Sequence, residues 1–168
     1  WNISYGSFLE DVGAVSALML RLSYGQTGQQ AVGSLYGTIP TYTNNTQGSF
    51  YPFGDIWVTP MTPNGYNADL KWETTTTYNV GVDLGFLDGR ITASAEFYHR
   101  YTTDLLNYTP VAAGSNLTNY LDANIGEVRN IGAEFEINAV AIQNQDWYWN
   151  IGANVAWNKT LITRLTSD

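Results

Sequence analysis

The chain contains no cysteine among its 168 residues, which excludes disulfide bonds, thiolate metal sites and cysteine nucleophiles. Charge is also scarce, because charged residues make up only 13% of the sequence, about half of the ~25% that is usual in soluble domains. Lysine and arginine number 7 against 15 acidic residues, which gives a net charge of -8. This balance argues against a nucleic-acid partner and against electrostatic docking on an anionic lipid leaflet.

Long apolar runs are missing as well. No window approaches the roughly 18 apolar residues that a membrane-spanning helix requires. The sequence has no start methionine and no basic-then-apolar leader, so we expect a mature chain or a fragment. Aromatic residues, in contrast, reach 14%, and asparagine, threonine, glycine and glutamine supply most of the polar half. This composition suits a β-protein with one apolar face and one polar, mostly uncharged face.

Apolar and polar residues alternate in five stretches of the chain. In the second of these, Val80 and Val82 alternate with Asn79 and Asp83. Alternation with a period of two residues predicts strands whose two faces differ in polarity. The five predicted strands cover residues 17–25, 73–86, 91–101, 130–142 and 147–157.

The connections between the predicted strands alternate between short and long. Residues 87–90 and 143–146 are short breaks, whereas residues 26–72 and 107–124 are long and polar, without a convincing periodic element. This order predicts an antiparallel up-and-down sheet with tight turns at one end and long, extracellular loops at the other. Residues 7–15 are compatible with a short helical turn before the first strand.

The apolar faces carry aromatic residues at their edges. Trp147 and Trp157 lie on one face of the last predicted strand, and ten residues of tilted strand span about 23 Å, close to the ~25 Å apolar band of a membrane barrel. The polar faces contain almost no lysine, which is unusual for a solvated sheet. These features favour a transmembrane β-barrel. The alternative is a soluble β-sandwich that binds glycans through aromatic loops.

The number of predicted strands is too small for a closed barrel. Bacterial single-chain barrels have an even number of strands and at least about 8 of them, and open sheet edges are not tolerated in lipid. We therefore expect an all-β, antiparallel, up-and-down segment of a transmembrane barrel, with about five strands of a larger barrel.

Several longer stretches carry a family resemblance. They are "LRLSYGQTGQQ" (20–30), "YNADLKWETTTTYNVGVDLGFLDGRITASAEFYHRYTTDLL" (66–106), "NIGEVRNIGAEFEINA" (124–139) and "WNIGANVAWNKTLITRL" (149–165). The most specific matches are "LKWET" at 70–74, "NIGAE" at 130–134 and "WNK" at 157–159. In these stretches the sequence resembles the C-terminal barrel of SusC/RagA-type TonB-dependent transporters, which are outer-membrane nutrient importers of Bacteroidetes.

The resemblance implies a location in outer-membrane lipid and a barrel of about 22 strands, closed by an N-terminal plug. It further implies a SusD-like lipoprotein lid, energy from TonB, and import of oligosaccharides or peptides. The plug and the region that contacts TonB are expected to lie outside these 168 residues. No cofactor is implied.

Two groups of residues are candidates for function. One is the set of polar side chains expected to line the barrel lumen or to contact the plug, namely Asn79, Asp83, Glu96, Glu134 and Glu136. The other is an aromatic loop expected to contact ligand or lid, namely Phe50, Tyr51, Phe53 and Trp57. For the loop, the competing interpretation is a segment held together by its own aromatic cluster.

Catalysis is not expected. Paired carboxylates such as Glu134 and Glu136 would suit glycan hydrolysis, and an outer-membrane hydrolase is therefore the enzymatic alternative. However, His99 is the only histidine, and no serine or aspartate stands at a recognisable spacing from it. The carboxylates are better explained as the lining of a wet barrel interior.

Overall fold

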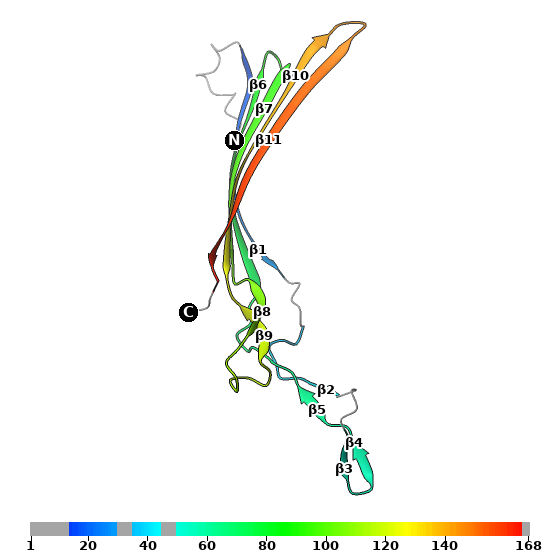
Figure 1. Ribbon diagram of the computed structural model, residues 1–168. Coiled ribbons are helices and arrows are strands. Elements are labelled where there is room, and N and C mark those ends of the chain that lie inside the picture. The colour runs from blue at the N-terminus through cyan, green and yellow to red at the C-terminus, as the bar shows by residue number, and fades with distance from the viewer. Residues whose placement is uncertain (1–13, 30–34, 45–49, 166–168) are drawn as a thin grey trace. The chain divides into compact units, whose positions relative to one another are not determined.

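The computed structural model describes residues 14–29, 35–44 and 50–165 (Figure 1). The chain divides into two compact units, which are treated separately. The first combines Trp1–Thr27, Thr75–Thr102 and Val128–Thr163, and the second combines Gly28–Thr74, Thr103–Glu127 and Arg164–Asp168. Most of the helical turn considered for 7–15 lies outside the described residues. Within the described part, no helix is long and apolar enough to cross a membrane.

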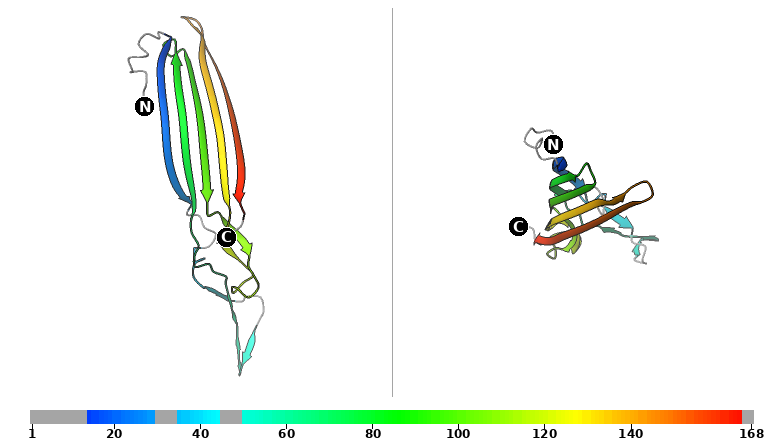
Figure 2. Two further views of the ribbon diagram at one scale, coloured as in Figure 1. Left: turned by 90° about the vertical axis from the view of Figure 1, so that its left-hand side faces the viewer. Right: turned by 90° about the horizontal axis from the view of Figure 1, so that it is seen from above.

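Five long strands form one sheet, in the spatial order β1-β6-β7-β10-β11 (Figure 2). β7 and β10 pair antiparallel, from Ile91 opposite Ala139 to Thr102 opposite Val128. The strands are β1 (Val15–Gln29), β6 (Glu73–Phe86), β7 (Ile91–Thr103), β10 (Glu127–Gln143) and β11 (Tyr148–Arg164). The prediction of an all-β, up-and-down sheet of five strands is confirmed.

Tight turns join β6 to β7 and β10 to β11. In the first turn, the Arg90 amide donates to the Leu87 carbonyl at 3.1 Å. The two central residues, Asp88 and Gly89, have φ of 55° and 82°, as a type I′ hairpin turn requires. In the second turn, the Asn144 side chain accepts hydrogen bonds from the Asp146 and Trp147 amides at 3.0 and 2.7 Å. The local sequence thus closes both hairpins.

Four of the strands extend beyond their predicted ends. β7 ends two residues later than predicted, at Thr103. β1 begins two residues earlier and ends four residues later than predicted, at Val15 and Gln29. β10 begins at Glu127 rather than residue 130, and β11 continues to Arg164 rather than residue 157. Backbone pairing does not require alternation of polarity, so strands continue beyond the stretch in which the alternation is visible.

The described residues of the sheet enclose no hydrophobic core. No hydrophobic side chain is buried in the part of the chain that the structure describes. On the apolar face, Val80, Phe97 and Ile151 expose 44%, 49% and 48% of their surface. A soluble sandwich would cover this face with a second sheet about 10 Å away, whereas the other sheets formed by the described residues have two strands each.

Only four residues in the described ranges are buried, and all four are glycines: Gly81, Gly85, Gly126 and Gly132. Each lies under a neighbouring group. The Tyr98 ring, for example, occupies the space that a Cβ would need at Gly132, which is its direct partner in the β7–β10 pair. A missing side chain on one strand therefore makes room for a large side chain on the next.

The second unit contains short two-stranded ribbons within the predicted connections. β2 (Tyr42–Asn44) pairs with β5 (Met61–Pro63), and β3 (Tyr51–Phe53) pairs with β4 (Ile56–Val58). β8 (Leu106–Pro110) pairs with β9 (Tyr120–Asn124). Residues 26–72, which show no convincing periodic element in the sequence, thus contain the short strands β2 to β5, because a strand of three residues is too short to give a periodic signal.

Candidate functional site

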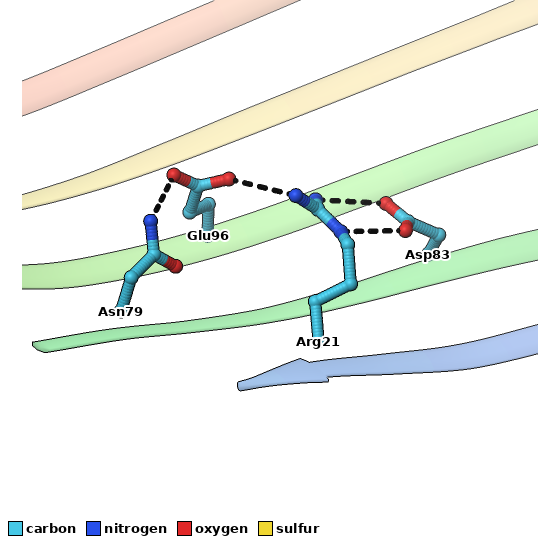
Figure 3. A network of polar contacts seen from close by, with 4 residues as sticks. All are labelled: Arg21, Asn79, Asp83 and Glu96. Atoms are coloured by element: carbon cyan, nitrogen blue, oxygen red, sulfur yellow. Dashed lines mark hydrogen bonds and ion pairs between the residues drawn. The ribbon is translucent and has the colours of Figure 1, made fainter. Parts of the chain in front are cut away.

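A charged network joins three neighbouring strands on the polar face of the sheet (Figure 3). Arg21 of β1 donates from Nε to Asp83 Oδ2 at 2.7 Å and from Nη2 to Asp83 Oδ1 at 3.0 Å. Its third nitrogen, Nη1, donates to Glu96 Oε2 of β7 at 3.2 Å. The other Glu96 oxygen accepts from Asn79 Nδ2 at 2.6 Å. One guanidinium therefore bridges β1, β6 and β7, and the two-point contact with Asp83 fixes its orientation.

Gly81 provides the space for this guanidinium. A Cβ at Gly81 would lie 3.1 Å from both Cζ and Nη2 of Arg21. At Gly85, a Cβ would lie 3.1 Å from the Ser16 hydroxyl and from the Ala17 Cβ. The glycines on the polar face of β6 thus admit side chains of the adjacent strand β1.

Two further carboxylates lie beside the network on β10. Glu134 is the direct pairing partner of Glu96, and Glu136 accepts a hydrogen bond from Asn138 Nδ2 at 2.7 Å. Both line the same hollow as Arg21 and Glu96, together with Ser94 and Asn154. The predicted polar residues Asn79, Asp83, Glu96, Glu134 and Glu136 therefore gather on one face.

Sequence reasoning missed Arg21, the centre of the network. A signal was present, because Arg21 is the only lysine or arginine in residues 1–70 and stands on the polar side of its strand. Its partners could not be inferred, since they depend on the register between β1 and β6. The cluster combines four carboxylates with one guanidinium, so this part of the polar face is net negative.

The opposite face is apolar and aromatic. The Tyr78 ring contacts the rings of Tyr24 and His99, with centroids 5.2 and 6.3 Å apart. A shallow apolar depression further along this face is lined by residues such as Val82, Phe135 and Trp157. His99 is therefore on the face away from Glu96 and Asp83, and no histidine–carboxylate pair forms there. No cluster of metal ligands occurs in the described residues.

The predicted aromatic loop forms the β3–β4 hairpin of the second unit. Tyr51 pairs with Val58, and Phe53 pairs with Ile56. The exposed fractions of Tyr51, Phe53 and Trp57 are 63%, 69% and 71%, and Phe50 exposes 59%. These side chains present apolar surface instead of burying one another.

Comparison with known proteins decides the family. Residues 1–168 match the family described as TonB dependent receptor-like, beta-barrel. The chain belongs to this family. Its location is accordingly the bacterial outer membrane, and its five-stranded sheet is an unclosed part of a barrel wall.

Relatives of this TonB-dependent receptor barrel are several times longer than the chain. It is 44% identical to TonB-dependent receptor SusC from Bacteroides thetaiotaomicron, covering 99% of the chain and 17% of that protein. It is 32% identical to TonB-dependent receptor P3 from Formosa agariphila, covering 98% of the chain and 16% of that protein. The chain thus spans about a sixth of their length.

Solved structures agree with the sequence relatives. The fold matches a chain of the RagAB peptide transporter with a TM-score of 0.77 at 28% identity, covering 99% of this chain and 17% of that one. It matches the RagAB peptide importer in the closed-closed state with a TM-score of 0.78. The resemblance of this TonB-dependent receptor barrel to the SusC/RagA type is thereby confirmed.

Proposed function

We propose that the chain is a wall segment of a SusC-type, TonB-dependent transporter that imports oligosaccharides or peptides with a SusD-like lipoprotein. The observation that supports this most is the contrast between the two faces of a single sheet. One face is apolar, aromatic and uncovered, and the other carries the network around Arg21. A membrane barrel turns the first kind of face to lipid and the second to a wet interior.

The carboxylate-rich face then lines the lumen or contacts the plug. Ionised groups are costly in lipid unless they turn away from it, so Asp83, Glu96, Glu134 and Glu136 face inward together with Asn79. The long connections emerge at the other end from the tight turns, on the outer surface. TonB acts through a region beyond these residues.

The exposed β3–β4 hairpin is proposed to contact the lid lipoprotein or the ligand. Its aromatic faces suit the apolar faces of sugars and the side chains of peptides, and Asp55 is its one charged residue. The match to a peptide transporter favours peptides, and the paucity of charge favours neutral ligands. The proposal therefore includes both oligosaccharides and peptides as substrates.

The two alternatives receive less support. A soluble glycan-binding sandwich would cover the apolar face, which is bare on β6 and β7. A hydrolase of the serine–histidine type would place its histidine beside a carboxylate, whereas His99 contacts Tyr78 on the other face. A glycoside hydrolase can work with carboxylates alone, but both oxygens of Glu96 are engaged, one by Arg21 and one by Asn79.

The hairpin can be tested in the full-length protein. Phe53→Ser combined with Trp57→Ser should reduce nutrient uptake or co-purification of the lipoprotein, while Asp55→Ser, on the same hairpin, is the matched control. Loop changes leave the strand ladder intact, so both variants should keep the heat-dependent migration in SDS gels that marks a folded barrel. Unchanged uptake and unchanged lipoprotein binding in the double variant would show that the hairpin makes neither contact.

A further inference from the structure

We propose that side chains from the "LKWET" motif (70–74), from the segment before it and from residues 116–124 form an amide clasp, which holds residues 64–73 and the β8–β9 hairpin together as one body. The amide clasp is defined as the side chains of Asn67, Glu73, Asn116 and Asn124 with the backbone groups that they bind. It joins residues 64–73, which end at the first residue of β6, to residues 104–124, which contain the β8–β9 hairpin. Both segments belong to the second unit.

Asn124 is the central residue of the clasp. Its Oδ1 accepts from the Lys71 amide at 2.7 Å, and its Nδ2 donates to the Lys71 carbonyl at 2.8 Å. The same Nδ2 donates to the Asp104 carbonyl, also at 2.8 Å. A single side chain thus satisfies both backbone groups of Lys71, as a paired strand residue would, and also holds the chain just before β8.

Asn116 repeats this arrangement at the other end of the hairpin. Its Oδ1 accepts from the Tyr66 amide at 3.4 Å, and its Nδ2 donates to the Tyr66 carbonyl at 2.9 Å. A two-point contact of this kind needs a donor and an acceptor in one planar group, which a carboxylate cannot provide. The asparagine content of these connections therefore has a structural reason.

Two more bonds complete the clasp. Asn67 Nδ2 donates to the Asp122 carbonyl at 3.3 Å. Glu73 Oε1 accepts from the Leu106 amide at 2.9 Å, where β8 begins. Contacts are thus spread along the full length of the hairpin. Because an isolated two-stranded hairpin is at best marginally stable in water, these bonds order β8 and β9 against the 64–73 segment.

The assignment gives the family-specific motif a positioning role. The clasp uses the backbone of Lys71 and the side chains of Glu73 and Asn124. Replacing the Lys71 side chain should therefore leave the clasp intact, whereas replacing the Asn124 side chain should open it. If the motif bound ligand instead, replacing the exposed, charged Lys71 side chain would have the larger effect.

Hydrogen exchange in full-length protein tests the clasp. Asn124→Ala should speed exchange of the amides in 66–71 by about tenfold or more, with exchange in β6 and β7 unchanged. Asn124→Asp, which keeps the acceptor and loses the donors, should also open the clasp. Lys71→Ala is the matched control and should exchange as wild type. Wild-type exchange in Asn124→Ala, or an equal effect in Lys71→Ala, would overturn the assignment.

A disulfide provides a second readout. A Cβ at Gly65 would lie 3.4 Å from the Thr118 Cβ and 3.1 Å from the Tyr120 carbonyl oxygen, so a shift of a few tenths of an ångström brings the two Cβ atoms to the ~3.8 Å mean separation of disulfides. In a cysteine-free background, Gly65→Cys with Thr118→Cys should therefore cross-link rapidly on oxidation, and Asn116→Ala should slow cross-linking several-fold. Failure of the pair to cross-link in folded protein, or equal rates with and without Asn116, would show that the segments are not held together by the clasp.

Discussion

Arg21 on β1 and Asp83 on β6 are joined by two hydrogen bonds of 2.7 and 3.0 Å, although 62 residues separate them in the chain. The connection between these strands is too long to fix their register, unlike the tight turn between β6 and β7. A slip of one residue would carry Arg21 to the apolar face. The ion pair therefore adds to the alternating pattern of β1 in selecting the alignment that places each side chain on its proper face.

This relationship predicts unequal effects of removing the two partners. Asp83→Asn should be mild, because its oxygen can still accept one bond and Glu96 still binds Arg21. Arg21→Met should lower the temperature of barrel unfolding further, since Asp83 and Glu96 then face each other uncompensated. Heat-dependent migration in SDS gels gives both midpoints. A larger drop for Asp83→Asn would contradict this reading of the network.

The assignment of faces predicts the effect of new charges. Val82→Arg and Ile137→Arg should each impair assembly, at a cost of about 2–4 kcal/mol if the site is near the bilayer midplane. Asn154→Arg adds the same side chain to the hollow lined by Glu96 and Glu134 and should be tolerated. Folded yield in outer membranes is the measurement. Normal yield for the first two variants with loss of the third would mean that the faces are reversed.

Because the Tyr98 ring covers Gly132, we predict that a side chain at position 132 is poorly tolerated. Gly132→Ala should destabilise the barrel by about 1–3 kcal/mol, because the new methyl group collides with the ring. Gly25→Ala is the control, since a Cβ there meets nothing within 4 Å. Adding Tyr98→Ala should relieve the clash, and denaturant titration of the four combinations measures the coupling. Additive effects at Gly132 and Tyr98 would refute the contact.

The alternation of short and long connections predicts orientation. A cysteine replacing Asp55, between β3 and β4, should react with an impermeant maleimide on intact cells. A cysteine replacing Gln145, in the turn between β10 and β11, should react only after the outer membrane is opened. The native sequence of these residues contains no cysteine to interfere. The opposite labelling pattern would invert the topology.

Residues whose environment is set by their own strand were predictable from the sequence. Val80 and Asp83 were assigned to opposite faces by alternation alone, and Asp88-Gly89 marked the turn that β6 and β7 share. Glu134 and Glu96 fell on the same face, and the structure makes them direct partners.

Residues whose role depends on a distant segment were not predictable. The pairing of Arg21 with Asp83 requires the register of β1, which no local pattern encodes. The β3–β4 ribbon has only three residues in each strand, and the contact between Asn124 and Lys71 joins two connections that contain little regular structure. Side chain–backbone bonds of this kind leave no periodic trace, because one amide can reach any nearby peptide group.

The central claim is that the alternating faces of β6 separate lipid from a wet interior. Spin labels placed singly from residue 79 to residue 84 in full-length protein, reconstituted in bilayers, measure this directly through collisions with oxygen and with a water-soluble nickel complex. We predict that oxygen collisions are frequent at Val80, Val82 and Leu84 and low at Asn79 and Asp83, with a period of two residues. Oxygen maxima at Asn79 and Asp83, or no periodicity at all, would contradict the account.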